Sequence, residues 1–218
     1  MNLNKMIDHT LLKPEAKEED IKKLCEEALK YDFKSVCVNP CWVELVSELL
    51  SKSDIKTCVV VGFPLGASDS KVKEFEAKIA IEKGAEEIDM VINIGFLKSK
   101  KYDLVESEIK NIVKISRGRI VKVILETCLL DKEEIVQACE ICTRAGVDFV
   151  KTSTGFSTAG ANIDDVKLMR ENISEKMQVK ASGGIRNLET ALGMINAGAT
   201  RIGSSSGVSI MEEYNYEN

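Results

Sequence analysis

The residues best suited to covalent chemistry in this chain are two lysines that each follow an apolar run. Lys151 ends the segment VDFVK, and Lys180 ends the segment MQVK. A lysine at the end of a buried strand has its amine at the edge of a sheet, where the amine can attack a carbonyl group. The sequence therefore indicates a site for Schiff-base chemistry.

A lysine needs a special environment to act as a nucleophile at neutral pH. Because the pKa of a free lysine is about 10.4, only about 1 amine in 2,500 is neutral at pH 7. If Lys151 and Lys180 end neighbouring strands about 5 Å apart, their repulsion is ~3 kcal/mol at an effective dielectric constant of about 20. That repulsion would lower the pKa of one of them enough to raise its neutral fraction about a hundredfold.

Three loops rich in small and hydroxyl residues follow three consecutive predicted strands. The candidate residues in them are Thr154, Gly155, Gly183, Gly184, Gly203, Ser205 and Ser206. Backbone N–H groups exposed by glycine, hydroxyl donors and a helix N-terminus together form an anion site. We expect a substrate phosphate to bind there, and tight turns that bind no ligand are the alternative.

The elements that position these residues alternate between strand and helix along the whole chain. The predicted strands span residues 5–10, 34–38, 56–61, 87–92, 120–125, 147–151, 177–181 and 200–203. The predicted helices span residues 15–30, 41–50, 70–83, 102–115, 132–144, 163–172, 188–196 and 208–214. Because a helix follows each strand, the strands should be parallel.

Eight such units predict an α/β fold, a single (β/α)8 TIM barrel that forms one domain over residues 1–218. A doubly wound open sheet is the alternative, but such a sheet concentrates its site at one switch point. The barrel is favoured because the candidate site residues fall on many strands.

Polar and charged residues interrupt several predicted strands. They include Asp8, Thr10, Cys37, Asp89 and Lys122. Buried charges are costly unless they are paired, and chemistry in barrels collects at the C-terminal ends of the strands. These residues therefore indicate a reactive site. The alternative is an inert buried network in which Lys122, Lys151 and Lys180 pair with Asp8, Asp89 and Glu126.

Composition and charge exclude several classes of protein. The chain has 218 residues, of which 44% are hydrophobic and 30% charged, and its net charge of −5 argues against nucleic-acid binding. No apolar run approaches the roughly 20 residues of a membrane span, and the first residues lack the pattern of a signal peptide. We expect a cytoplasmic protein.

The seven cysteines and the single histidine offer little basis for a metal site. Cys139 and Cys142 form a CxxC pair, but the pair lies within a predicted helix and has no second pair or nearby histidine. We interpret these cysteines as buried thiols in a reducing compartment. His9 is the only histidine, which argues against His-based metal clusters and a Ser-His-Asp triad.

Nearly the whole chain resembles the deoxyribose-phosphate aldolases, which are class I aldolases. The resemblance is carried by DHTLLKP (8–14), VCV (36–38), VGFPLG (61–66), EIDMVIN (87–93), KVILET (122–127), VKTSTGF (150–156) and VKASGGI (179–185). It implies reversible cleavage of 2-deoxy-D-ribose 5-phosphate to D-glyceraldehyde 3-phosphate and acetaldehyde, with no metal or organic cofactor. It also implies a homo-oligomer, either a dimer or a tetramer.

The resemblance assigns roles to individual positions. Lys151 matches the Schiff-base lysine, Lys180 the second lysine that perturbs it, and Asp89 the aspartate that transfers protons through a water molecule. The supporting positions are Asp8, Thr10, Lys122 and Cys37, and the cysteine matches one that reacts with aldehydes. Some members use a C-terminal tyrosine in proton transfer, for which this chain offers Tyr214 and Tyr216.

Two other functions would use the same three loops. A different phosphate-binding barrel, an isomerase or a synthase, needs no activated lysine. A non-catalytic phosphometabolite-binding protein would use the lysines only as counter-ions. Neither would form a covalent adduct with its ligand, which separates both from an aldolase.

Overall fold

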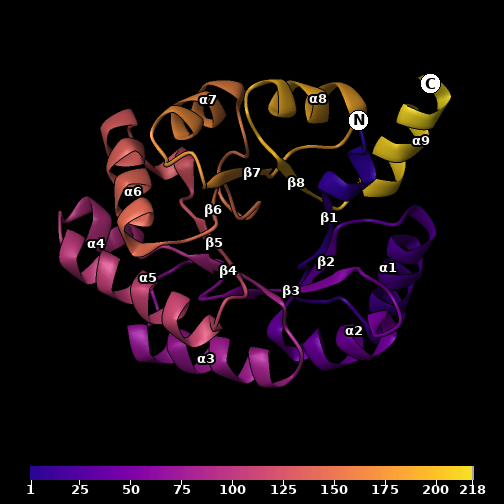
Figure 1. Cartoon of the computed structure of the whole chain (residues 1–218), viewed down its shortest axis with the longest axis horizontal. Coiled ribbons are helices and arrows are strands. Elements are labelled where there is room, and N and C mark those ends of the chain that lie inside the picture. Colours follow the sequence, from indigo (N-terminus) through magenta and orange to yellow (C-terminus); the bar gives the residue numbers. More distant parts are fainter. Residues whose placement is uncertain (218) are drawn as a thin grey trace.

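The computed structural model describes residues 1–217, and its strands form a closed barrel surrounded by helices (Figure 1). The eight strands are parallel and pair in chain order, and the last strand pairs with the first. The predicted (β/α)8 TIM barrel is therefore confirmed, and the open sheet is wrong.

The element boundaries lie close to the predicted ones. The strands are β1 Ile7–Leu11, β2 Ser35–Val38, β3 Lys56–Val61, β4 Glu87–Val91, β5 Ile120–Ile124, β6 Phe149–Lys151, β7 Gln178–Ser182 and β8 Arg201–Ser204. The helices are α1 Glu18–Tyr31, α2 Val43–Leu50, α3 Ser70–Glu82, α4 Ile94–Lys98, α5 Tyr102–Ser116, α6 Lys132–Ala145, α7 Ile163–Glu171, α8 Leu188–Asn196 and α9 Gly207–Glu217. Three short 3-10 helices are η1 Leu3–Met6, η2 Pro40–Trp42 and η3 Thr127–Leu129.

Several predicted boundaries were wrong by a few residues, for local reasons. Helix α1 begins at Glu18 and not at residue 15, and the carboxylate of Asp20 accepts the backbone N–H of Lys17 at 2.9 Å just before it. Such a bond caps the free N–H groups of a first turn. Strand β6 begins at Phe149, two residues later than predicted. Helix α4 was not predicted, because five residues are too few to show a helical period.

Alternate residues along each strand give the two faces of the sheet very different surroundings. Residues such as Val59, Ile88, Val123 and Val150 belong to the main hydrophobic core, which lies between the strands and the outer helices. The residues between them point into the barrel, where most of the buried charges lie. A small apolar cluster also occupies the interior, formed by Leu12, Cys37, Cys58 and Val60.

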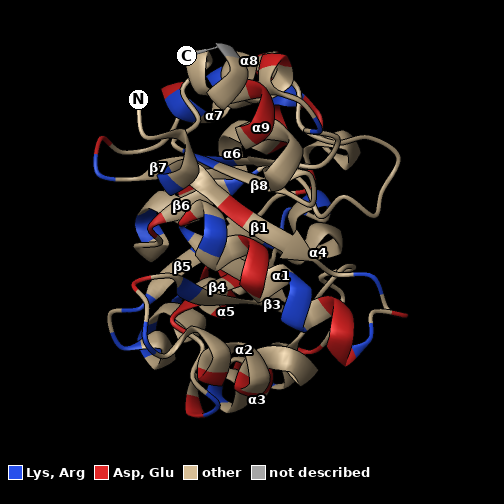
Figure 2. Cartoon of the chain, turned by 90° about the vertical axis from the view of Figure 1, so that its right-hand side faces the viewer, with Lys and Arg blue, Asp and Glu red and all other residues tan. Residues whose placement is uncertain are grey.

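The helices cover the barrel through apolar stripes. Helix α5 buries Val105, Ile109 and Ile112, which recur at helical spacing on one face. On the side seen in Figure 2, basic and acidic residues are intermingled along the outer helices. None of the described helices has both the length and the apolar character needed to cross a membrane.

Candidate active site

At the centre of the barrel interior, the Asp89 carboxylate accepts hydrogen bonds from three lysine amines. Its Oδ2 lies 2.7 Å from Lys151 Nζ and 2.8 Å from Lys180 Nζ. Its Oδ1 lies 2.8 Å from Lys122 Nζ and 3.2 Å from the thiol of Cys58. The Asp89 carboxylate therefore lies between Lys151 and Lys180, and its negative charge offsets part of the repulsion between the two amines.

A second layer of charges extends this network toward the N-terminal ends of the strands. Arg201 Nη1 lies 2.7 Å from Asp8 Oδ1 and 3.0 Å from Glu87 Oε2. Asp8 also binds Lys180, and Glu87 also binds Lys122. All of these side chains are buried, so the network has little water to screen it.

The strand register brings the members of the network together. Asp89 of β4 pairs directly with Lys122 of β5, and Lys151 of β6 pairs directly with Lys180 of β7. Side chains at paired positions of adjacent strands point to the same face of the sheet. The expectation that the two lysines occupy neighbouring strands is therefore confirmed.

The network keeps Asp89 and Lys180 charged. Burial alone would raise the pKa of Asp89, but the amines of Lys122, Lys151 and Lys180 hold that pKa well below its usual range. Burial would likewise lower the pKa of Lys180, but the carboxylates of Asp8 and Asp89 raise it above the ordinary lysine value. Lys180 is thus a permanent cation beside Lys151.

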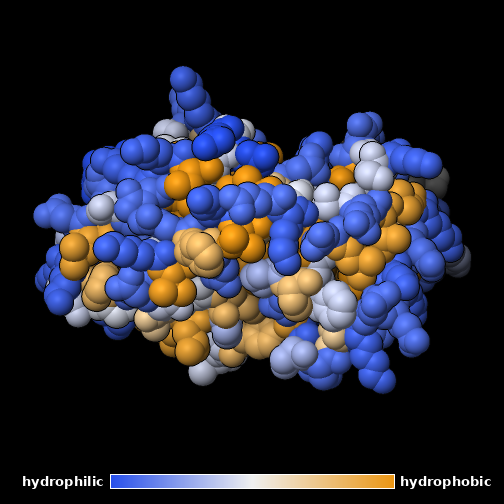
Figure 3. All heavy atoms as spheres, turned by 90° about the horizontal axis from the view of Figure 1, so that it is seen from below, coloured by the Kyte–Doolittle hydropathy of each residue, from blue (hydrophilic) through white to orange (hydrophobic). Residues whose placement is uncertain are grey.

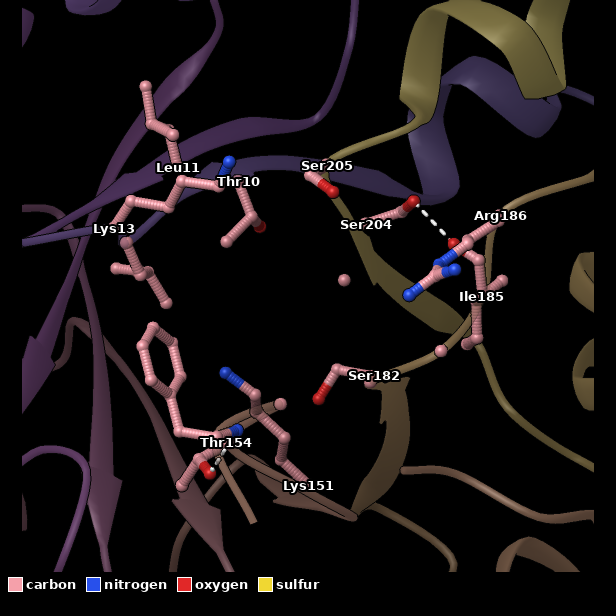
Figure 4. A pocket seen from close by; sticks show the side chains of 16 residues that line it. Thr10, Leu11, Lys13, Lys151, Thr154, Ser182, Ile185, Arg186, Ser204 and Ser205 are labelled. Carbon is pink, nitrogen blue, oxygen red and sulfur yellow. Dashed lines mark hydrogen bonds between the residues drawn. The ribbon is translucent and has the colours of Figure 1, made fainter. Parts of the chain in front are cut away.

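A cavity of about 400 Å³ opens at the C-terminal ends of the strands, and the side chain of Lys151 lines it. The amine of Lys151 and the guanidinium of Arg186 point into the same space (Figure 4). The predicted site residues that line the cavity are Thr10, Lys151, Thr154, Gly155, Gly183, Gly184, Gly203 and Ser205. Among the described residues, Lys151 is the one member of the ion network that reaches it.

The other predicted site residues lie beneath or beside the cavity. Asp8, Asp89, Lys122 and Lys180 belong to the ion network below its floor, and Cys37 lies among the apolar side chains of the interior. Ser206 does not line the cavity: its carbonyl accepts the N–H of Ile210 at 3.0 Å in the first turn of α9.

The glycine loops have backbone geometry that other residues would strain. Gly155, Gly183 and Gly184 have φ values of +84°, +88° and +78°, in the region that favours glycine. A Cβ on Gly160 would lie 2.2 Å from the carbonyl oxygen of Gly183. The loops after β6 and β7 therefore pack backbone against backbone at the edge of the cavity.

Sequence reasoning missed two cations that line the cavity, Lys13 and Arg186. Neither forms an ion pair within the described chain, so both positive charges are available to a ligand. Each lies beside a motif that was recognised, Lys13 in DHTLLKP and Arg186 directly after VKASGGI. Their position next to those motifs was the signal that could have found them.

Two thiols near Asp89 do not make a plausible metal site. The sulfur atoms of Cys37 and Cys58 and a carboxylate oxygen of Asp89 lie within 4.8 Å of one another. Lysine amines already occupy both oxygens of that carboxylate, and they would repel a metal cation. The two thiols instead interact, and the neighbouring Cys58 side chain lowers the pKa of Cys37.

Neither candidate tyrosine lies at the cavity. The hydroxyl of Tyr214 donates to the carbonyl oxygen of Met1 at 2.8 Å, which ties the end of α9 to the start of the chain. Tyr216 is 93% exposed.

Comparison with known proteins identifies the family. The sequence model of the DeoC/LacD family aldolases matches residues 3–213. A deoxyribose-phosphate aldolase of Clostridium novyi is 62% identical to this chain, over 100% of the chain and 99% of the relative. One of Streptococcus sanguinis is 63% identical over 97% of the chain and 96% of the relative.

Solved structures agree with the sequence relatives. A protein described as QR15, an aldolase, superposes with a TM-score of 0.94 at 45% identity, covering 98% of this chain and 96% of that one. A deoxyribose phosphate aldolase of Aeropyrum pernix, described as a unique tetramer, has a TM-score of 0.92 at 39% identity, over 99% of this chain and 92% of that one. The chain therefore belongs to the DeoC/LacD aldolase family.

Proposed function

We propose that this protein is a deoxyribose-phosphate aldolase that reversibly cleaves 2-deoxy-D-ribose 5-phosphate through a Schiff base on Lys151. The observation that carries the proposal is that Lys151 belongs both to the buried ion network and to the lining of the cavity. An amine in that position meets a substrate carbonyl on one side and a proton carrier on the other. Relatives of this name at about 60% identity over the whole chain support the same reaction.

The buried network has one more basic group than it has carboxylates. The network contains four basic groups, on Lys122, Lys151, Lys180 and Arg201. They face three carboxylates, those of Asp8, Glu87 and Asp89. When the Lys151 amine is neutral, three cations face three anions, which is the less costly state for a buried network.

The proposed reaction begins with attack of the Lys151 amine on the C1 aldehyde of the open-chain sugar. Loss of water gives an iminium ion, which accepts the electron pair of the C2–C3 bond as the proton leaves the C3 hydroxyl group. D-glyceraldehyde 3-phosphate then departs and an enamine stays on Lys151. Protonation of that enamine and hydrolysis of the resulting iminium release acetaldehyde and restore the amine.

Asp89 is the proposed proton carrier, acting through a water molecule. Three lysine amines hold its pKa low in the resting network. When the Lys151 amine is neutral, one of those three positive charges is gone and the carboxylate accepts a proton more readily. The nucleophile and the base are therefore coupled through the hydrogen bond from Lys151 Nζ to Asp89 Oδ2.

The opposite end of the cavity is the proposed phosphate site. The turn at Gly183 and Gly184 and the segment Gly203 to Ser205 before α9 present backbone and hydroxyl groups to the cavity. Helix N-termini and exposed N–H groups bind phosphate. The unpaired cations of Lys13 and Arg186 supply positive charge for a dianion. Binding at this end orients the aldehyde toward Lys151.

A cleavage assay tests the proposed function. The protein should release acetaldehyde from 2-deoxy-D-ribose 5-phosphate, and Lys151→Leu should abolish that release while the circular dichroism spectrum stays unchanged. A phosphate-binding isomerase, a synthase or a non-catalytic binder would release no acetaldehyde, and that result would remove the proposal.

We also propose a dimer or tetramer that acts in the cytoplasm without a metal or organic cofactor. The surface of α3 exposes Val72 and Phe75, at 56% and 65% of their areas, and Figure 3 shows apolar side chains among charged ones on the side of the molecule that includes α3. The described cysteines are all free thiols, which suits a reducing compartment. If light scattering gives the mass of a monomer, the proposal of an oligomer is wrong.

A further inference from the structure

A buried acid just past the end of β5 has no role in the reaction described above. Glu126 has the left-handed backbone angles φ +57° and ψ +61°, which are uncommon and strained for a residue with a side chain. On either side of it, Leu125 N–H donates to the carbonyl of Lys151 at 2.9 Å and Thr127 N–H donates to the carbonyl of Thr152 at 3.0 Å. The chain thus bulges at Glu126, between two backbone hydrogen bonds to the end of β6 and the residue after it.

Glu126 is 2% exposed, and its carboxylate forms no ion pair within the described chain. Its hydrogen-bond donors both belong to Thr154. The backbone N–H of Thr154 donates to Oε1 at 3.2 Å, and the hydroxyl of Thr154 donates to Oε2. A buried charge without a counter-ion depends on such donors, so Glu126 and Thr154 hold each other in place.

The pairing fixes the turn that follows. Because the Thr154 hydroxyl gives its proton to Glu126, its oxygen is oriented to accept the backbone N–H of Phe156 at 3.0 Å. Between these two residues Gly155 takes a left-handed conformation with φ +84°. The N–H of Gly155 has no hydrogen-bond acceptor within residues 1–217. This N–H can therefore donate a hydrogen bond to a ligand.

The turn begins beside Lys151 (Figure 4) and meets the proposed phosphate loops through Gly155. Thr154, Gly155 and Phe156 all line it, and a Cβ on Gly155 would lie 3.9 Å from the Cα of Gly183 in the next loop. Thr154 therefore lines the cavity, but its hydroxyl donates to Glu126 and accepts from Phe156.

We infer that Glu126 is a positioning residue for the phosphate end of the substrate, acting through Thr154 on the Thr154–Phe156 turn. The inference rests on the proposed function, because it takes deoxyribose 5-phosphate as the substrate. Glu126 touches neither the cavity nor the ion network. Its contribution is the orientation of the turn and of the Gly155 N–H.

The sign of the expected effect separates positioning from simple electrostatics. Glu126 carries a negative charge near a site for a dianion, so removal of that charge alone should strengthen phosphate binding. Removal of the hydrogen bonds that hold the turn should weaken it. In Glu126→Gln the amide oxygen can still accept the N–H of Thr154, but the amide NH2 meets the hydroxyl that formerly donated to the carboxylate.

The test compares kcat and KM for 2-deoxyribose 5-phosphate and for unphosphorylated 2-deoxyribose. In Glu126→Gln we expect KM for the phosphorylated sugar to rise about tenfold, the size of one lost hydrogen bond to a charged group. KM for the unphosphorylated sugar should change by less than about twofold, and so should kcat, because the amines at Lys151 are untouched. Inorganic phosphate should inhibit the variant correspondingly less well.

Variants of Thr154 test the pairing, and they also cover the case that Glu126→Gln does not fold. Thr154→Val removes the hydroxyl and should raise KM for the phosphorylated sugar as Glu126→Gln does, whereas Thr154→Ser keeps the hydroxyl and should resemble the parent protein. The double variant Glu126→Gln/Thr154→Val should be no worse than either single variant by more than about twofold, because one interaction is lost in each.

Glu86→Gln is the matched control, since Glu86 also accepts a backbone N–H and a side-chain donor but lies at the opposite end of the barrel. It should leave both KM values unchanged. Three results would each overturn the inference. In Glu126→Gln, KM could rise equally for both sugars, or KM for the phosphorylated sugar could stay unchanged or fall. In the double variant, the effects of the two substitutions on KM could be independent. If the parent protein releases no acetaldehyde, the proposed function itself fails, which is a distinct outcome.

Discussion

At the residue scale, the decisive feature is that Lys151 and Lys180 share one oxygen of Asp89. Lys180 is held charged by Asp8 and Asp89, and its side chain is fully buried. Lys180 is therefore the fixed cation and Lys151 the amine that reaches the cavity, although they occupy paired positions of adjacent strands.

That division of tasks predicts the behaviour of Lys180→Leu. Without the cation of Lys180 beside the Lys151 amine, the profile of kcat/KM against pH should shift to higher pH. The rate at pH 7 should fall by at most about a hundredfold, because ~3 kcal/mol is the repulsion between the two amines before Asp89 offsets part of it. A profile of unchanged position would show that Lys180 serves structure alone.

The sequence predicted part of this site and could not predict the rest. Lys122, Lys151 and Lys180 were found because each breaks an apolar strand, which is costly without a partner. Glu87 and Arg201 are equally buried, but each begins its strand and so looks like a residue at the solvent end.

At the element scale, helices α3 and α5 are joined by a charged pair behind the barrel wall. Lys73 Nζ lies 2.7 Å from Glu108 Oε1 and donates to the carbonyl of Val91 at 2.9 Å, and both side chains are fully buried. Ser70 also donates to Glu108, at 2.9 Å. The pair fastens both helices to the C-terminal end of β4, the strand that carries Asp89.

Such a pair makes a clear prediction for stability. Lys73→Met leaves Glu108 buried without its cation and should lower the free energy of unfolding by about 3–5 kcal/mol. The double variant Lys73→Met/Glu108→Leu removes both charges and should recover most of that loss. Denaturant titration measures both values. A single variant as stable as the parent would show that the pair is not effectively buried.

Helical and strand periods predicted the long elements correctly, but not the close contacts between loops. The backbone contact of Gly160 with Gly183 joins loops about 20 residues apart, and nothing in the local pattern marks it. The left-handed bulge at Glu126 was also invisible, because a residue with a side chain seldom adopts it.

At the scale of the whole molecule, the barrel is a polar interior enclosed by an apolar shell. Counting eight strand–helix units predicted the closed barrel, because parallel strands with right-handed crossovers close at that number. The polar character of the interior did not follow from the count. It appears only when the register places charged residues of β1, β4, β5, β6, β7 and β8 on the inner face.

This interior predicts how stability depends on pH. The lysines and Arg201 hold the pKa values of Asp8 and Asp89 below the unfolded value, against the effect of burial. Their contribution is present above pH ~4 and is lost as pH falls further, because the unfolded chain then binds more protons. Burial lowers the pKa of His9 as well, so a smaller loss should begin as pH falls below about 6.5.

Denaturant titrations across this range check both windows. Asp8→Asn should be less stable than the parent at pH 7 and should lose less stability between pH ~4 and 2. His9→Gln should flatten the curve between pH ~6.5 and 5. Curves parallel to that of the parent in both variants would contradict the assignment of acid sensitivity to these groups.

The proposed reaction requires a covalent bond between Lys151 and the substrate, and borohydride reduction traps that bond. The protein is incubated with 2-deoxy-D-ribose 5-phosphate and sodium borohydride, digested, and mapped by mass spectrometry. We expect a reduced adduct on Lys151 and an unmodified Lys180. An adduct on Lys180 in place of Lys151, or a fully active protein with no adduct on any lysine, would contradict the proposed role of Lys151.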